Sequence, residues 1–312
     1  MRSAAMSEPA ASASSLPFQR VAIIGCGLMG GSLALALRAA GRAGHITGYS
    51  TTPASLQAAL DQGVIDQAAT SAAQAAQGAD LVVLAVPVGA MAPSFAAIAP
   101  VLAPGALVID VGSTKSDVIA AARAHLGPRL PDFVPCHPIA GKEKAGSAAA
   151  SATLYRDRRA VVTPLPENPS AQVARATSLW RAVGCEVVTM DAAQHDTAFA
   201  AVSHLPHLLA FAYVNGLLDQ PDGAAFMAAG GPGFRDFSRI AGSEPAMWRD
   251  VLLANRDQVL AQSHAFRQAL DQIEADLRAG AGDALAARIQ QASDARAAWV
   301  LGGPGNTSPH DG

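Results

Sequence analysis

The chain has 312 residues, of which half are apolar and 15% are charged. Disorder of the whole chain is excluded, because it requires low hydrophobicity and high charge, and the length suits two compact domains. The formal net charge of -3 comes from 22 basic and 25 acidic residues. This balance does not indicate a nucleic-acid-binding protein, which typically carries a basic stripe.

Both ends of the chain are predicted to be disordered tails. Residues 1–17 are rich in alanine and serine and lack the apolar stretch of a signal peptide, and residues 303–312 are rich in glycine and polar residues. The apolar segment 197–218 contains His204 and Pro206 among other polar or helix-breaking residues, so we predict a helix buried in a domain or dimer core and no membrane span. Three widely spaced cysteines predict neither a disulfide framework nor a metal site, and they fit a reducing cytoplasm.

The first part of the chain alternates between short apolar strands and helices. Strands are predicted at 21–25, 45–50, 80–88, 106–113, 133–138, 159–164 and 185–190. Helices are predicted between them at 30–41, 55–63, 91–99 and 170–183. This alternation predicts a mostly parallel sheet with both faces covered, and hence an α/β domain over residues 18–190.

No strand pattern follows Met190. Helical patterns occupy 191–218, with a kink or break at Pro206, and then 244–278 and 283–300. We therefore predict an all-α domain over residues 191–302.

A G-x-G-x-x-G sequence joins the first strand to the first helix and predicts a Rossmann-like dinucleotide site. Gly25 permits the tight turn, Gly27 lets the backbone approach a pyrophosphate, and Gly30 allows the helix to pack closely on the strand. Leu28 and Met29 lie inside this turn, at the start of the helix whose free N–H groups attract phosphate.

The end of the second strand bears on the choice between NAD and NADP. An acidic side chain normally binds the ribose diol there, but this chain has Ser50 and Thr51, with no adjacent arginine for a 2′-phosphate. The hydroxyl groups suit either cofactor, so the choice stays open. Val86 and Pro87, at the end of the 80–88 strand, are assigned to the same nucleotide site.

Candidate chemistry lies in loops expected at the carboxyl edge of the sheet, where ligands bind in such folds. His137 follows a strand in the segment CHPIAGKEKAG, and Glu143 lies six residues further on. Ser113 ends another strand, in the segment DVGSTKSD. A neutral histidine is suited to accept a proton near pH 7.

Four motifs then resemble the prephenate dehydrogenase family, which includes arogenate and cyclohexadienyl dehydrogenases. They are HPIAGKEKAG, the GST after a strand, SHLPH and GGPGFRDFSRIAGSEPAMWRD, in the expected order. The resemblance spans about residues 20–300. It implies oxidative decarboxylation of prephenate to 4-hydroxyphenylpyruvate with hydride transfer to NAD(P), in tyrosine biosynthesis. It also implies a homodimer formed through the helical domain.

The resemblance implies roles for individual residues. His137 would accept the proton of the ring hydroxyl, and Ser113 would hydrogen-bond His137 or that hydroxyl. Arg239 would bind the ring carboxylate in a bidentate contact, which lysine imitates poorly. The remaining residues assigned to the substrate site are His207 and Ser203, the gate residues Glu143, Arg235 and Asp236, and the wall residue Trp248.

Other interpretations remain at this point. Arogenate differs from prephenate by one amine in place of a keto group, so it is an alternative substrate. A β-hydroxyacid dehydrogenase would need a catalytic lysine in the helical domain, and no lysine follows Lys144. A non-catalytic dinucleotide-binding module is a third alternative. His195 and His204 are expected to be structural, and Lys115 is expected to be a solvated charge or to steer an anionic substrate.

Overall fold

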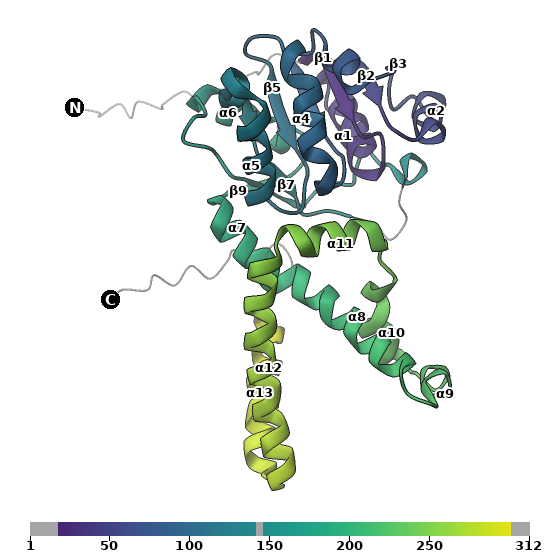
Figure 1. Cartoon of the computed structure of the whole chain (residues 1–312), viewed down its shortest axis with the longest axis vertical. Helices are drawn as coiled ribbons and strands as arrows, with labels where there is room; N and C mark the ends of the chain where they lie inside the picture. The colour runs from purple at the N-terminus through teal and green to yellow at the C-terminus, as the bar shows by residue number, and fades with distance from the viewer. Residues whose placement is uncertain (1–17, 142–145, 301–312) are drawn as a thin grey trace, which may run out of the picture.

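The computed structural model describes residues 18–141 and 146–300 (Figure 1). The predicted tails and Glu143 lie outside these residues. An α/β part forms one end of the molecule, and two helical arms extend from it.

The α/β part is built on a six-stranded parallel sheet with the strand order β3-β2-β1-β4-β5-β6. Its strands are β1 (Phe18–Ile24), β2 (Ala43–Tyr49), β3 (Gln67–Ala68), β4 (Leu81–Leu84), β5 (Leu107–Asp110) and β6 (Phe133–Val134). The helices of this part are α1 (Leu28–Ala39), α2 (Pro53–Asp61), α3 (Ala72–Ala76), α4 (Met91–Ile98), α5 (Ser116–His125) and α6 (Ser170–Ala182). This strand order is that of a Rossmann sheet, so the predicted Rossmann-like fold is confirmed. The sequence pattern does not predict the short elements β3 and α3, or helix α5.

Both faces of the sheet are buried, as its continuous apolar strands predict. Along β1, Val21 and Ile23 belong to one hydrophobic cluster, whereas Ala22 and Ile24 belong to the cluster on the opposite face. Alternate strand residues point to opposite faces, so each face packs against its own layer of helices.

A second sheet of three strands contains β7 (Cys136–Pro138), β8 (Arg159–Val162) and β9 (Glu186–Thr189). Strand β7 is antiparallel to β8, and β9 is parallel to β8. The single strand predicted at 133–138 is therefore wrong: it divides at Pro135, with β6 in the large sheet and β7 in the small one. This division carries His137 out of the large sheet.

The helical part begins with a long interrupted helix. Helix α7 (Ala192–Phe199) runs through a π-helical turn (Ala200–His204) into α8 (Leu205–Leu218), which has Pro206 in its first turn. The π-helical turn is the interruption that Pro206 predicts.

The other helices are α9 (Gly223–Ala228), α10 (Pro232–Ser238), α11 (Pro245–Ala254), α12 (Arg256–Ala279) and α13 (Gly282–Ala298). The predicted helix 244–278 is thus two helices that meet at Asn255. In Figure 1, α8, α9 and α10 form one arm, α12 and α13 form the other, and α11 lies across the edge of the α/β part between them.

Much of the apolar helix is exposed within one chain. The run Ala192–Leu218 is long and apolar enough to cross a membrane by length and composition, and 22% of its apolar window is buried. Within one chain, Leu205 and Ala210 are the buried residues of α8, so of the two expected locations for this helix the core of a single domain does not apply. Burial of this helix between two chains stays a prediction.

Candidate active site

The glycine turn has the geometry that a dinucleotide requires. Gly25 has φ +101°, and a Cβ atom there would overlap the carbonyl oxygen of Ala85. A Cβ atom on Gly30 would overlap the carbonyl oxygen of Gly25. In contrast, nothing lies within 4 Å of a Cβ atom built on Gly27, the N-cap of α1. The open backbone at the amino end of a helix fits a pyrophosphate group.

Neighbouring contacts hold this turn in place. Leu28 and Met29 are half-buried, and the hydroxyl of the fully buried Tyr155 donates a 2.6 Å hydrogen bond to the Met29 carbonyl. The thiol of Cys26 is also buried, and burial raises its pKa to about 11. Cys26 is therefore an uncharged packing residue at neutral pH.

Two further segments lie at the carboxyl ends of neighbouring strands. Ser50 follows β2, and its Oγ atom accepts a 3.2 Å hydrogen bond from the Thr52 backbone N–H, while Thr51 is exposed. Val86 and Pro87 follow β4, and the short helix after them contacts α11 of the helical part. The loop after β4 therefore lies where the two parts of the chain meet.

His137 is joined to two residues of α7. Its Nδ1 atom lies 2.8 Å from Nε2 of His195, whose own Nδ1 atom lies 2.9 Å from Oδ1 of Asp196. All three side chains are buried, with relative exposures of 9%, 0% and 4%. Burial is the main cause that lowers the pKa of His137 well below its usual value, and the neighbouring His195 ring and the Lys115 ammonium group lower it further. The ring is therefore neutral, and able to accept a proton, at pH 7.

A buried ion pair fixes the backbone just before His137. Lys115 and Asp110 are both fully buried, and the Lys115 ammonium group donates to the Asp110 carboxylate and, at 2.8 Å, to the Cys136 carbonyl. The other carboxylate oxygen of Asp110 accepts a 2.9 Å hydrogen bond from the Cys136 N–H. The expectation that Lys115 is solvated or steers substrate is wrong, because its ammonium group is buried in an ion pair with Asp110.

An aromatic cluster continues from this point into the helical part. Trp248 of α11 is stacked on His207 of α8, with ring centroids 3.5 Å apart, and its edge meets the ring of His204 at 6.1 Å. His204 also acts electrostatically on His137, and the positive charge of Arg239 contributes to lowering the pKa of His207, after burial as the main cause. Ring contacts through Trp248 therefore join His204 to His207, and electrostatic interactions relate this cluster to His137 and to Arg239.

The other predicted site residues are placed differently. Ser113 is half-buried in the loop after β5, at the carboxyl edge of the sheet. Ser203 lies in the π-helical turn and accepts a 2.9 Å hydrogen bond from His207 through its backbone carbonyl. Arg235 and Asp236 are exposed on α10 and form an ion pair with each other, so within one chain their charges face solvent. The proposed gate partner Glu143 lies outside the described residues.

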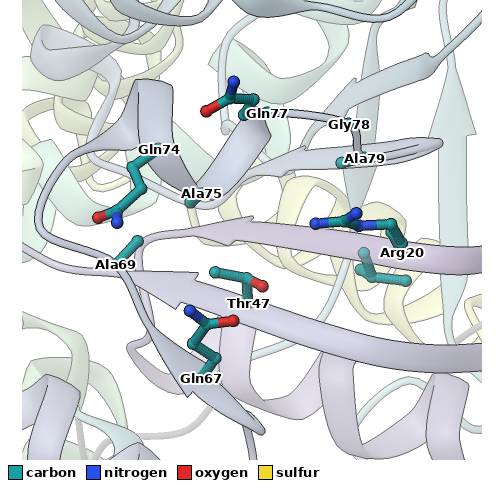
Figure 2. A pocket seen from close by; sticks show the side chains of 10 residues that line it. Arg20, Thr47, Gln67, Ala69, Gln74, Ala75, Gln77, Gly78 and Ala79 are labelled. Atoms are coloured by element: carbon teal, nitrogen blue, oxygen red, sulfur yellow. The ribbon is translucent and has the colours of Figure 1, made fainter.

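Figure 2 shows a pocket elsewhere, on the face of the sheet beside α3. Its lining includes Arg20, Thr47, Gln67 and Gln74. It shares no lining residue with the glycine turn or with the cluster around His137. It therefore has no part in the site described above.

The sequence does not reveal the contacts of His195 and Asp196. His195 is expected to be structural, and the structure places it in a direct hydrogen bond to His137. His204 is hydrogen-bonded to Asn255 and packs against Trp248, which fits its expected structural role. One signal was present: the Asp191 capping box starts α7, which places His195 and Phe199 on one face at i and i+4. Phe199 packs over both histidine rings, with centroids 4.8 Å from His137 and 4.4 Å from His195.

A glycine turn on a Rossmann sheet, together with a buried histidine cluster formed where the α/β part meets the helical part, is typical of a dinucleotide-dependent oxidoreductase. The profile described as "Prephenate dehydrogenase, nucleotide-binding domain" matches residues 33–189, and "Prephenate dehydrogenase, dimerization domain" matches residues 191–291. The chain belongs to the prephenate dehydrogenase family.

Individual relatives agree with this assignment. A cyclohexadienyl dehydrogenase of Zymomonas mobilis is 31% identical over 283 residues, which cover 90% of this chain and 96% of the relative. The crystal structure of Aquifex aeolicus prephenate dehydrogenase with hydroxyphenyl propionate and NAD+ has a TM-score of 0.84 and 35% identity, covering 90% of this chain and 98% of that one. Synechocystis arogenate dehydrogenase has a TM-score of 0.76 and 28% identity, covering 90% of this chain and 100% of that one.

Proposed function

We propose that this chain catalyses the oxidative decarboxylation of prephenate to 4-hydroxyphenylpyruvate, with hydride transfer to NAD+ or NADP+. The observation that carries the proposal is the buried, neutral ring of His137, hydrogen-bonded to His195 and backed by Asp196. A β-hydroxyacid dehydrogenase would instead rely on a lysine in its helical domain, and residues 145–312 contain none.

In this proposal the residues of the chain divide the chemistry among themselves. His137 accepts the proton of the ring hydroxyl through Nε2, with Ser113, from the loop after β5, as a hydrogen-bond partner. Arg239 binds the ring carboxylate until it leaves as CO2, and His207 contacts the side chain of the substrate, with Trp248 as the pocket wall. A bound nicotinamide ring supplies the hydride acceptor. Loss of hydride, proton and CO2 together converts the diene ring into a phenol.

The cofactor assignment rests on the residues that would hold it. The open backbone at Gly27 and the amino end of α1 fit the pyrophosphate. Ser50 and Thr51 offer hydroxyl groups to a ribose diol, and they neither repel nor pair with a 2′-phosphate. The proposal therefore includes both NAD+ and NADP+ as cofactors.

The assembly we propose is a homodimer formed through the helical part. Large apolar side chains are exposed on both arms, including Tyr213 and Leu218 on α8 and Leu270 and Ile273 on α12. Exposed apolar side chains gathered on helices in this way are typical of a protein interface. We also propose a cytoplasmic location, because all three cysteines are free thiols.

Steady-state kinetics test the proposal with two substrates and two cofactors. Prephenate and arogenate are each combined with NAD+ and NADP+, and reduced cofactor is followed by absorbance at its nicotinamide band. Turnover of prephenate with either cofactor is the expected result. Preferential turnover of arogenate would instead identify arogenate as the substrate. Binding of cofactor without turnover of either substrate would favour a non-catalytic module and overturn the proposal.

A further inference from the structure

The carboxylate of Asp196 is tied to the backbone where α5 begins. Its Oδ1 atom accepts a 2.8 Å hydrogen bond from the Lys115 N–H, and its Oδ2 atom accepts one of the same length from the Ser116 N–H. Burial alone would raise the pKa of Asp196, but hydrogen bonds from His195, Ser116 and Lys115 outweigh burial and lower it to about 2. Asp196 is therefore an ionised carboxylate at neutral pH, and it can only accept hydrogen bonds.

The charge of Asp196 determines where the protons lie on the hydrogen-bonded side chains of Asp196, His195 and His137. Since Asp196 carries no proton, Nδ1 of His195 must donate the 2.9 Å hydrogen bond between them. Burial lowers the pKa of His195, so its ring is neutral and its Nε2 atom has a free lone pair. The 2.8 Å hydrogen bond to that atom must then come from Nδ1–H of His137. A neutral His137 with its proton on Nδ1 has an unprotonated Nε2 atom.

We propose that His195 and Asp196 are positioning residues, which hold His137 in the tautomer whose Nε2 atom accepts the substrate proton. When that proton arrives, His137 becomes an imidazolium ion that still donates through Nδ1 to His195, and the Asp196 carboxylate stabilises the new charge. The proton stays on Nε2, so no proton needs to move between these three side chains. The inference rests on the proposed function of His137 as the proton acceptor.

The surroundings make the Asp196 charge effective. Phe199 lies against both histidine rings and keeps the hydrogen bonds out of bulk water, where they would be weaker. The ammonium group of the neighbouring Lys115 is paired with the Asp110 carboxylate, and not with Asp196. Two other titratable groups interact electrostatically with these three side chains. They are His204, from the π-helical turn, and Asp117 of α5, whose pKa is raised by burial.

Two substitutions of His195 separate positioning from packing. In His195→Gln the amide oxygen can still accept a hydrogen bond from Nδ1 of His137, so the tautomer is kept. In His195→Leu that acceptor is lost, and the proton of His137 is free to move to Nε2. We expect kcat to fall by about 10²–10⁴ in His195→Leu and by at least about tenfold less in His195→Gln, with the KM for substrate changed little in both.

Asp196→Asn provides the pH readout. Removing the negative charge destabilises the imidazolium form of His137, so the acid limb of the kcat/KM profile should move to lower pH. A purely structural role would lower activity without moving this limb. Melting temperature and cofactor affinity, measured for each variant, identify any that is misfolded. His125→Gln, on the exposed end of α5, is the matched histidine control and should keep both the wild-type kcat and the wild-type limb.

A further readout does not depend on turnover. Nitrogen-15 NMR of histidine-labelled wild-type protein should show His137 with a protonated Nδ1 and an unprotonated Nε2, assigned by the loss of its signals in His137→Asn. If wild-type protein turns over neither substrate but shows this tautomer, the proposed function fails and the hydrogen-bond assignment stands. The inference is overturned if His137 carries its proton on Nε2, if the Gln and Leu variants lose kcat equally, or if the acid limb of Asp196→Asn does not move.

Discussion

The ring of Trp248 lies flat on the ring of His207, with centroids 3.5 Å apart and planes inclined by 20°. The Nδ1 atom of His207 lies 2.9 Å from the Ser203 carbonyl oxygen and therefore donates its proton to it. Burial first, and then the charge of Arg239, lower the pKa of His207. At neutral pH its remaining nitrogen, Nε2, is therefore an acceptor and not a donor.

This state of His207 predicts a pH-dependent preference between the two substrates. A neutral Nε2 suits the ammonium group of arogenate, whereas a protonated Nε2–H suits the keto oxygen of prephenate. As pH falls through the pKa of His207, which lies below the ordinary value of about 6.5, the ratio of kcat/KM for prephenate to that for arogenate should rise. Protonation of His137 lowers kcat/KM for both substrates equally, so its effect cancels in the ratio.

The measurement covers pH 5 to pH 7.5, where the arogenate amine stays charged. His207→Phe is the matched variant, because it keeps an aromatic ring against Trp248 and removes the titrating nitrogen. Its ratio should not vary with pH. A wild-type ratio that stays constant, or a variant ratio that changes equally, would contradict the role given to His207.

Replacing His137 by Asn tests the proton acceptor directly. The Asn amide can still donate to His195 from about the position of Nδ1, but it cannot accept a proton at neutral pH. We expect kcat to fall by about 10²–10⁴. Cofactor affinity, measured by quenching of tryptophan fluorescence, should stay within about twofold, because His137 is not one of the residues assigned to the cofactor. Near-normal turnover would remove His137 from the mechanism.

The glycine turn offers a matched pair of substitutions. Gly27→Ala adds a methyl group where no atom lies within 4 Å, and the backbone there has φ −79°. The fold should be unaffected, and the dissociation constant for the cofactor should rise by at least about tenfold, because the methyl group stands between the backbone and the pyrophosphate.

In contrast, Gly25→Ala should destabilise the fold. At φ +101° and against the Ala85 carbonyl, an alanine should cost about 1–3 kcal/mol of unfolding free energy. Chemical denaturation and cofactor titration of both variants check the pair. Equal losses of stability in Gly27→Ala and Gly25→Ala would show that the space over Gly27 is not free.

These predictions rest on features that the sequence reveals to different degrees. The Rossmann-like sheet and the nucleotide turn could be predicted because both depend on short-range patterns: apolar strands, intervening helices and the spacing of Gly25, Gly27 and Gly30. The division of the 133–138 strand could not, because it depends on Cys136 binding Asp110 and on β7 pairing with β8. Those contacts join residues 22 to 26 positions apart.

The same reason explains the residues missed around His137. His195 is 58 residues away in sequence, and its role follows from the approach of α7 to β7, which no local pattern encodes. In the sequence, Lys115 resembles an exposed charge in a loop. Its partner Asp110 is the last residue of an apolar strand, and no local pattern shows that the two side chains form a buried ion pair. The aromatic motif residues Trp248 and His207 were assigned to one site by resemblance, and their rings are in contact.

The Asp110–Lys115 pair predicts a large effect on stability. Lys115→Met leaves the Asp110 carboxylate buried without its partner, which should cost about 3–5 kcal/mol of unfolding free energy in urea. The double variant Asp110→Asn, Lys115→Met should lose less than the sum of the two single variants, because the groups interact directly. Arg38→Met, which breaks the exposed pair with Asp66, is the control and should cost less than about 1 kcal/mol. A loss in Lys115→Met no larger than in the control would refute the role of the buried pair.

The exposed face of α12 predicts where the second chain packs. Phe266, Leu270, Ile273 and Leu277 recur at intervals of three or four residues, and their exposures in the single chain are 37%, 40%, 38% and 59%. This spacing places them on one side of the helix, where they need an apolar partner. Sedimentation equilibrium should give twice the chain mass of 31.6 kDa for the wild type. In Leu270→Glu a charge replaces an interface side chain, which costs several kcal/mol when buried, so the dimer should dissociate. Gln268→Glu adds the same charge on another side of α12 and should remain dimeric; a wild-type protein that sediments as a monomer would show that this face has another partner.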